Sequence, residues 1–270
     1  MGRKTIRDIW KLTRDGQPIV ALTAYDYFTA KYVDEAGVDI ILVGDSLEMV
    51  IYGSDTTHTA TMEKMLYHTE AVARAVKNAM VVADMPFLSY HTGIGDAVKN
   101  AGRFIQAGAQ AVKLEGGWKF AAVVKAIVDS GIPVMGHIGM LPQSIHRIGG
   151  YFTQGADEET ASMLYEDARA LQESGAFAVV LEKVHPQTAE KITGMLEIPT
   201  IGIGSGPHCD GQILVINDIL GLFDKFTPPF VKKYADLKSQ IIEAARAFAE
   251  DVRNKKFPEQ KERRTDERKN

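Results

Sequence analysis

The sequence contains a single cysteine, Cys209, which excludes an intrachain disulfide and a cysteine-based metal site. A lone thiol is typical of a protein in a reducing compartment, so we expect a cytoplasmic location. The longest apolar runs fall well short of the roughly 18 residues that span a bilayer, and we expect no membrane partner. The 31 basic residues do not outnumber the 35 acidic ones, and the net charge of -4 argues against nucleic acid as a partner.

The two ends of the chain differ from the part between them. The opening MGRKTIRDIW is charged and is followed by no apolar core, so we expect no secretory signal. The last residues are dense in both signs of charge and lack an apolar face. We therefore expect one domain over residues 1–257 and a charged, disordered tail over residues 258–270. At 45% apolar and 24% charged residues, the composition is that of a globular protein.

Eight short apolar runs rich in β-branched residues predict the strands. They are Ile19–Ala24, Ile40–Gly44, Met80–Ala83, Ala111–Leu114, Pro133–Gly136, Ala178–Leu181, Pro199–Gly202 and Ile213–Ile216. Most are continuous rather than alternating, as buried parallel strands are. Segments long enough for helices separate most of them. These include Met62–Asn78, Gly95–Ala107, Lys119–Asp129 and Glu159–Glu173.

A recurring phrase joins these helices to the strands that follow. In EAGVDIILV, QAGAQAVKL, DSGIPVMG and ESGAFAVVL, a helix-like stretch ends on a small residue and a glycine. The four glycines are Gly37, Gly108, Gly131 and Gly175. Glycine just past a helix end adopts the left-handed conformation without a side-chain penalty. Eight repeated units of about 34 residues favour a (β/α)8 TIM barrel, with an open doubly wound sheet as the alternative.

Several segments fall outside this repeat. We expect an extra helix over Thr5–Thr13 and a final helix over Val231–Val252. The connections Leu47–Ala60 and Met140–Asp157 are long for a barrel, so they predict lids or binding loops, or else packed and subunit-contact segments. The glycine-rich Gly202–Gln212 could bind an anion through backbone N–H groups, but a tight turn with close backbone packing is the simpler interpretation.

Polar side chains gather where the predicted strands end. They are Asp45, Ser46, Asp84, Lys113, Glu115, His137, Glu182 and Lys183. In a barrel the carboxyl ends of the strands form the active-site face. One Asp after a strand is often only a helix cap or a turn residue. Four carboxylates at four strand ends, however, would converge on one mouth, and such a cluster implies a cation or a shared proton.

The metal that suits these carboxylates is Mg²⁺, which takes one or two protein carboxylates together with water and substrate oxygens. Zinc is disfavoured because the seven histidines form no His-x-x-x-His pair and there is no cysteine cluster. His137 is a candidate substrate contact, and a structural histidine at a strand end is the alternative.

Seven segments in order give the sequence a specific resemblance. They are LTAYD, ILVGDSLEMVIYG, VVADMPF, AVKLEGG, GHIGMLPQS, LEKV and GIGSGPHCDGQILVINDILG, and they span Leu22 to Gly221. On these segments the chain resembles the ketopantoate hydroxymethyltransferase family. Ser205 departs from it, since alanine is common there in the family.

The resemblance implies a (β/α)8 barrel and an Mg²⁺-dependent transfer of a hydroxymethyl group. The group moves from 5,10-methylenetetrahydrofolate to 3-methyl-2-oxobutanoate and gives 2-dehydropantoate. One Mg²⁺ per subunit is implied, as is a large cytoplasmic homo-oligomer, often a decamer. The implied metal ligands are Asp45, Asp84 and Glu115. The implied keto-acid contacts are Asp45, Ser46, Asp84 and Lys113. Glu182 is the implied proton acceptor.

Other interpretations of the same residues remain open. One is another Mg²⁺-dependent C–C lyase or aldolase of the phosphoenolpyruvate/isocitrate-lyase type, although the cysteine-bearing loop of many such enzymes is missing here. Another is a non-catalytic barrel that binds a phosphorylated ligand at GIGSG, which would not need four acids at strand ends. Glu182 itself could instead be a structural ion-pair partner or a fourth metal ligand.

Overall fold

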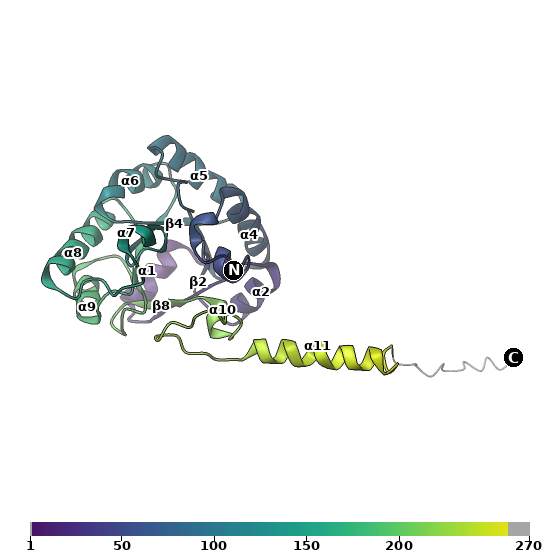
Figure 1. The fold of residues 1–270 in the computed structure, drawn as a ribbon. Coiled ribbons are helices and arrows are strands. Elements are labelled where there is room, and N and C mark those ends of the chain that lie inside the picture. The colour runs from purple at the N-terminus through teal and green to yellow at the C-terminus, as the bar shows by residue number, and fades with distance from the viewer. Residues whose placement is uncertain (1, 259–270) are drawn as a thin grey trace. The chain divides into compact units, whose positions relative to one another are not determined.

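The computed structural model describes residues 2–258, whose contacts divide into two compact units (Figure 1). The first unit ends at Ile216 and the second begins at Asn217. The single domain expected over residues 1–257 therefore comprises a large unit and a small C-terminal one. Of the tail expected over residues 258–270, all but Pro258 lies outside the described residues.

The first unit is a closed barrel of eight parallel strands, each paired with the next and β8 paired with β1. This confirms the predicted TIM barrel and excludes the open sheet. The strands are β1 (Ile19–Thr23), β2 (Ile40–Val43), β3 (Met80–Asp84), β4 (Ala111–Glu115), β5 (Val134–Gly139), β6 (Ala178–Glu182), β7 (Thr200–Ile203) and β8 (Gly211–Leu214).

Four of these strands, β3, β4, β6 and β7, continue one residue further than the apolar runs predict, and β5 continues three residues further. Asp84, Glu115 and Glu182 are the last residues of β3, β4 and β6. These residues belong to the strands because they pair with residues of the neighbouring strands: Asp84 pairs with Lys113, and Glu115 pairs with His137. The last strand was placed wrongly: it runs over Gly211–Leu214, since Gly211 pairs with β1 and β7, and Ile216 already begins a helix.

Alternate residues of the strands fill the barrel interior. The buried cluster includes Met80 and Val82 of β3, Ala111 of β4, Met135 of β5, and Ala178 and Val180 of β6. Successive side chains of a strand point to opposite faces, so the next interior positions are two residues further on. These positions are Asp84, Lys113, Glu115, His137 and Glu182. The polar site is therefore the top layer of the barrel interior.

The extra N-terminal helix closes the other end of the barrel. Helix α1 (Ile6–Arg14) begins after Thr5, whose side chain and backbone bond with Asp8 in a capping box. Ile9 is fully buried in the same cluster as the strand residues. The indole N–H of Trp10 donates to the carbonyl of Phe177 at 2.9 Å, just before β6. This confirms the predicted helix.

The remaining helices of the unit ring the sheet (Figure 1). The longer ones are α2 (Tyr27–Glu35), α4 (Met62–Ala75), α5 (Ile94–Gln106), α6 (Ala121–Asp129), α8 (Glu158–Glu173) and α9 (Pro186–Met195). The four glycines that follow α2, α5, α6 and α8 have φ values of 88°, 101°, 84° and 90°. The predicted helix–glycine–strand joints are therefore confirmed.

The two long connections contain short helices rather than open loops. The first holds α3 (Leu47–Val50) and the 3-10 helix η1 (Thr57–Thr59), and the second holds η3 (Pro142–Ser144) and α7 (Ile145–Ile148). A further 3-10 turn, η2 (Trp118–Phe120), precedes α6. These connections leave the strands at the carboxyl end of the barrel, where the polar layer lies.

The C-terminal unit carries α11 (Leu237–Arg253), and α10 (Ile216–Ile219) spans the boundary between the units. The prediction that the last helix starts at Val231 is wrong. Asp236 caps it, accepting from the backbone N–H of Ser239 at 3.3 Å, so the helix begins six residues later. None of the residues of α11 is buried by the described part of the chain. Within residues 2–258 no helix has the length and apolarity to cross a bilayer.

Candidate active site

A buried ion pair lies at the centre of the polar layer. The Nζ atom of Lys113 donates to both carboxylate oxygens of Asp84 at 2.8 Å. The two side chains are only 6% and 2% exposed. Burial alone would lower the pKa of Lys113, but the charges of Asp84, Glu115 and Asp45 outweigh it and raise that pKa. Lys113 is therefore a permanent cation among carboxylates.

Asp45 reaches this site through a turn rather than through the alternation of a strand. Strand alternation continued past Val43 would place Asp45 on the same face as Val43, but β2 ends at Val43 and the chain turns over Asp45 and Ser46. The turn brings the backbone N–H of Asp45 to 3.4 Å from Oδ2 of Asp84. Beside it, the hydroxyl of Ser46 lies 2.8 Å from that of Tyr25. The predicted Asp45, Ser46 and Asp84 are thus brought together.

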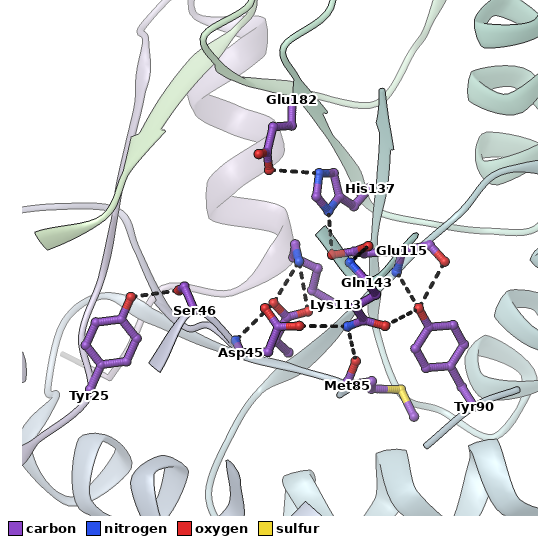
Figure 2. A network of polar contacts seen from close by, with 11 residues as sticks. Tyr25, Asp45, Ser46, Met85, Tyr90, Lys113, Glu115, His137, Gln143 and Glu182 are labelled. Carbon is purple, nitrogen blue, oxygen red and sulfur yellow. Dashed lines mark hydrogen bonds and ion pairs between the residues drawn. The ribbon is translucent and has the colours of Figure 1, made fainter. Parts of the chain in front are cut away.

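A second row of groups runs from Glu115 through His137 to Glu182 (Figure 2). Nδ1 of His137 lies 3.7 Å from Oε1 of Glu115, and Nε2 lies 3.3 Å from Oε2 of Glu182. Neither ring nitrogen reaches hydrogen-bond geometry with any described residue, so the contacts are loose. Burial, with help from the charge of Lys113, holds the pKa of His137 well below its usual value. The ring is therefore neutral.

Burial also changes the acids of this layer. It raises the pKa of Asp45, and the neighbouring charge of Asp84 raises it further. Burial and then the charge of Asp45 raise the pKa of Glu115 well above its usual value. Burial raises the pKa of Glu182 to about 7, against the opposing charges of Lys113 and Lys183. Lys113 alone cannot balance all of these groups in their ionised form, so without a further cation the layer favours protonated acids, and the pKa of Glu182 lies near neutrality.

The sequence did not single out Gln143, which is 3% exposed and contacts two of the acids. Its side-chain Nε2 donates to Oδ2 of Asp45 at 2.9 Å, and its backbone N–H donates to Oε2 of Glu115 at 3.0 Å. It belongs to η3, in the connection predicted as a lid or binding loop. An amide in a polar loop carries no charge pattern, so its only sequence signal is its place in GHIGMLPQS.

The two long connections meet beside this residue. Nε2 of His58, in the first connection, lies 2.9 Å from the carbonyl oxygen of Gln143 in the second. The rings of His58 and His146 stack with their centroids 4.9 Å apart. Glu48 is buried and bonds Lys64 at 2.7 Å, which ties the first connection to α4. The connections therefore border the site.

The glycine-rich segment Gly202–Gln212, which runs from β7 into β8, contains a residue that allows close packing. A Cβ atom on Gly211 would lie 2.5 Å from the carbonyl oxygen of Ile19, so only glycine lets β8 close the barrel against β1. This supports the tight-packing interpretation of Gly202–Gln212. Ser205 is fully buried, donating to the carbonyl of Leu181 at 2.7 Å and accepting from the N–H of Val184 at 2.9 Å. The hydroxyl that departs from the family pattern thus holds the backbone on either side of Glu182.

The chain is similar in sequence to a family of known enzymes. Residues 3–260 match the family model described as ketopantoate hydroxymethyltransferase. The chain belongs to this family. The 3-methyl-2-oxobutanoate hydroxymethyltransferase of Geobacter metallireducens is 54% identical over 259 residues, covering 96% of this chain and 97% of the relative. The enzyme of the same name from Ignicoccus hospitalis is 56% identical over 258 residues, covering 96% and 98%.

Solved structures resemble the fold at low sequence identity. A phosphonopyruvate hydrolase has a TM-score of 0.64 at 13% identity and covers 96% of this chain and 90% of its own. A 2,3-dimethylmalate lyase, a member of the PEP mutase/isocitrate lyase superfamily, has a TM-score of 0.61 at 15% identity, with coverages of 95% and 87%. These likenesses show the barrel alone. Membership of the ketopantoate hydroxymethyltransferase family makes the chain a transferase and favours this activity over the lyase alternative.

The acids of this family member are not arranged as a three-ligand metal cluster. Within residues 2–258, no three His, Cys, Asp or Glu side chains are grouped so as to hold a metal ion. Asp84 is paired with Lys113, and one oxygen each of Asp45 and Glu115 accepts from Gln143. Oε1 of Glu115 is buried and has no hydrogen-bond partner among the described residues.

Proposed function

We propose that this site transfers a hydroxymethyl group from 5,10-methylenetetrahydrofolate to 3-methyl-2-oxobutanoate, giving 2-dehydropantoate. The observation that carries the proposal is one buried layer that holds a fixed cation, Lys113, and an acid of near-neutral pKa, Glu182. The named activity of the relatives that share more than half of its residues supports the same substrates.

The acids of the layer fit a hard divalent cation. Carboxylate oxygens suit Mg²⁺, and the layer holds more carboxyl groups than one lysine can balance. A divalent cation would contact the unpartnered Oε1 of Glu115 and would replace the protons that the raised pKa values of Asp45 and Glu115 favour. We propose that Asp45, Asp84 and Glu115 hold one Mg²⁺ per subunit. Since Mg²⁺ commonly takes only one or two protein carboxylates and keeps several waters, one or two of the three would bind it directly and the rest through its waters. When bound, it would polarise the keto carbonyl as a Lewis acid.

Each remaining group has a task set by its chemistry. Lys113 would neutralise the carboxylate of the keto acid and the charge of its enolate. The hydroxyl of Ser46 lies beside Asp45 and would donate to a substrate oxygen. Glu182 would remove the C3 proton, since a carboxylate with a pKa near 7 is a better base than an exposed one. The role of His137 as a substrate contact stays a prediction, because both its ring nitrogens face carboxylates.

The carbon transfer then balances without a further oxidant or reductant. The C3 carbanion forms a bond to the methylene carbon of the folate, the two C–N bonds to that carbon break, and the folate nitrogens regain protons. Water supplies the hydroxyl oxygen, because the methylene carbon is bonded only to nitrogen and hydrogen in the folate. We propose that the connections Leu47–Ala60 and Met140–Asp157 border the folate, since they line the same end of the barrel.

The test is one assay with both substrates. Purified enzyme given the keto acid and the folate should form 2-dehydropantoate, EDTA should abolish this, and added Mg²⁺ should restore it. Cleavage of a 2-oxo acid without any transfer would favour the lyase alternative, and full transfer by metal-free protein would refute the metal assignment.

We also propose a cytoplasmic homo-oligomer, on the family resemblance. Light scattering should then report several times 29.6 kDa, and a monodisperse monomer at micromolar concentration would refute it.

A further inference from the structure

Gln143 makes five polar contacts although it is neither charged nor at a strand end. Its Nε2 donates to Oδ2 of Asp45 at 2.9 Å and to the carbonyl of Met85 at 3.0 Å. Its Oε1 accepts from the hydroxyl of Tyr90 at 2.9 Å. Its backbone contacts Glu115 through the N–H and His58 through the carbonyl. Figure 2 shows its side-chain contacts with Asp45, Met85 and Tyr90. The residue, which lies in the second long connection, thus links two acids of the layer to the end of β3 and, through His58, to the first long connection.

The surroundings determine which way the amide of Gln143 faces. A backbone carbonyl and a carboxylate only accept hydrogen bonds, so the two atoms nearest Nε2 both require a donor there. Reversing the amide would place its oxygen against Oδ2 of Asp45 and the carbonyl of Met85. Because all these groups are buried, each lost bond would leave a polar atom unpaired and away from water, which is destabilising.

Tyr90 holds the other end of the amide. Its ring is 1% exposed, and its hydroxyl accepts from the N–H of Glu115 at 3.2 Å. The single hydroxyl hydrogen then has two acceptors in reach: Oε1 of Gln143 at 2.9 Å and the carbonyl of Glu115 at 3.1 Å. The shorter contact is to Gln143. Tyr90 therefore links the backbone of Glu115 to the side chain that holds Asp45.

We propose that Gln143 is a positioning residue for the cation and keto-acid site, an inference that rests on the proposed function. Its amide anchors Oδ2 of Asp45. Its backbone N–H anchors Oε2 of Glu115 and leaves Oε1, which has no hydrogen-bond partner among the described residues, for a ligand. Tyr90 acts through Gln143 by fixing the amide. One residue thereby sets the orientation of acids that lie 70 positions apart in the sequence.

The variant that tests the side chain is Gln143→Met, which keeps the length and the neutrality of the side chain but removes both the N–H donor and the oxygen acceptor of the amide. Gln143→Glu is less useful, because an added carboxylate could itself attract the cation. Tyr90→Phe removes only the hydroxyl. The matched control is Thr200→Val: Thr200 is fully buried, and its hydroxyl bonds that of Thr193 at 2.7 Å at the opposite end of the barrel.

The measurement is Mn²⁺ binding by electron paramagnetic resonance on full-length protein freed of metal, with and without 3-methyl-2-oxobutanoate, alongside thermal unfolding. Gln143→Met should bind Mn²⁺ about 10–100-fold more weakly than wild type, the usual effect of losing a group that orients a ligand. Tyr90→Phe should weaken binding less, and should add less in the Gln143→Met background than alone. Thr200→Val should lower the melting temperature without changing Mn²⁺ affinity.

Two results would overturn the inference. If Gln143→Met folds and binds Mn²⁺ with wild-type affinity, the amide has no positioning role. If Gln143→Met does not fold, wild-type affinity in Tyr90→Phe would show the same. A loss of affinity in Thr200→Val equal to that in Gln143→Met would show that any lost buried bond has the same effect. Failure of the proposed metal site looks different, because the wild-type enzyme itself would then bind no Mn²⁺. Failure of the proposed transfer is seen only in the assay with both substrates, and it leaves the comparison of Mn²⁺ affinities unchanged.

Discussion

Asp84 and Lys113 occupy paired positions on β3 and β4, and their side chains form an ion pair with both N–O distances at 2.8 Å. The pair lies at the point where the apolar interior of the barrel gives way to its acids. Lys113 is thus the resident cation of a layer that also contains Asp45 and Glu115. Its charge and that of the proposed metal ion would together balance these carboxylates.

Replacing the lysine should therefore make the protein dependent on metal for stability. In Lys113→Met the buried acids lose their counter-charge, which strongly destabilises a protein when one partner of a buried pair is removed. Saturating Mg²⁺ should raise the melting temperature of this variant by more than that of wild type, because a cation binds the folded state alone. Differential scanning fluorimetry with EDTA or Mg²⁺ measures the two shifts.

The control for this prediction is an exposed lysine. Lys125 pairs with Asp129 one turn along α6, and both side chains are more than half exposed. Lys125→Met should therefore show the wild-type response to Mg²⁺. An equal response to Mg²⁺ in Lys113→Met and wild type would mean that the acids do not share their charge balance with a metal.

The pH dependence of proton removal should report the raised pKa of Glu182. The base must be ionised, and with a pKa of about 7 its ionised fraction falls roughly tenfold between pH 8 and pH 6. The rate of C3 proton exchange at low keto-acid concentration should fall by the same factor. An exposed glutamate would show this decline near pH 4. A rate that stays constant down to pH 5 would contradict the assignment.

The same pKa predicts an effect of opposite direction on stability. A carboxyl group whose pKa is raised on folding binds its proton more tightly in the folded state, so folded stability falls as pH rises from about 4.5 to 7. Glu182→Gln removes this loss. In metal-free protein it should melt at or above the wild-type temperature at pH 8, with the advantage gone near pH 4.5. A variant that melts well below wild type at pH 8 would indicate a structural role for Glu182.

The N-terminal helix offers a test of fold apart from function. Ile9 is fully buried in the cluster that fills the barrel, so Ile9→Ala should cost about 2–5 kcal/mol of unfolding free energy. The fraction of Ile9→Ala that folds should keep the wild-type affinity for Mn²⁺, because the acids lie at the other end of the strands. Urea denaturation measures the first quantity and paramagnetic resonance the second. A near-neutral Ile9→Ala would show that α1 does not seal the barrel.

How much of this site the sequence predicts depends on whether a residue continues the strand pattern. Lys113 and Glu115 follow that pattern, since alternation along a strand is enough to place them on one face. Asp45 does not, because a turn after Val43 redirects it, and only the family resemblance assigned its role. Gln143 bonds Asp45 across 98 positions of sequence, a contact that no local pattern contains. The predicted start of α11 is wrong for a local reason. The cap at Asp236 sets where the helix begins, although apolar residues precede it.

The most direct test of the whole account is hydrogen exchange at C3 of 3-methyl-2-oxobutanoate in D₂O with Mg²⁺ and without folate. Wild-type enzyme should exchange this proton, and Glu182→Gln should bind Mg²⁺ and keto acid yet exchange about 10²–10⁴-fold more slowly. Glu190→Gln, at a carboxylate that is 59% exposed, should exchange at the wild-type rate. Exchange by Glu182→Gln at the wild-type rate would contradict the account, and loss of its Mg²⁺ binding would place Glu182 among the metal ligands instead.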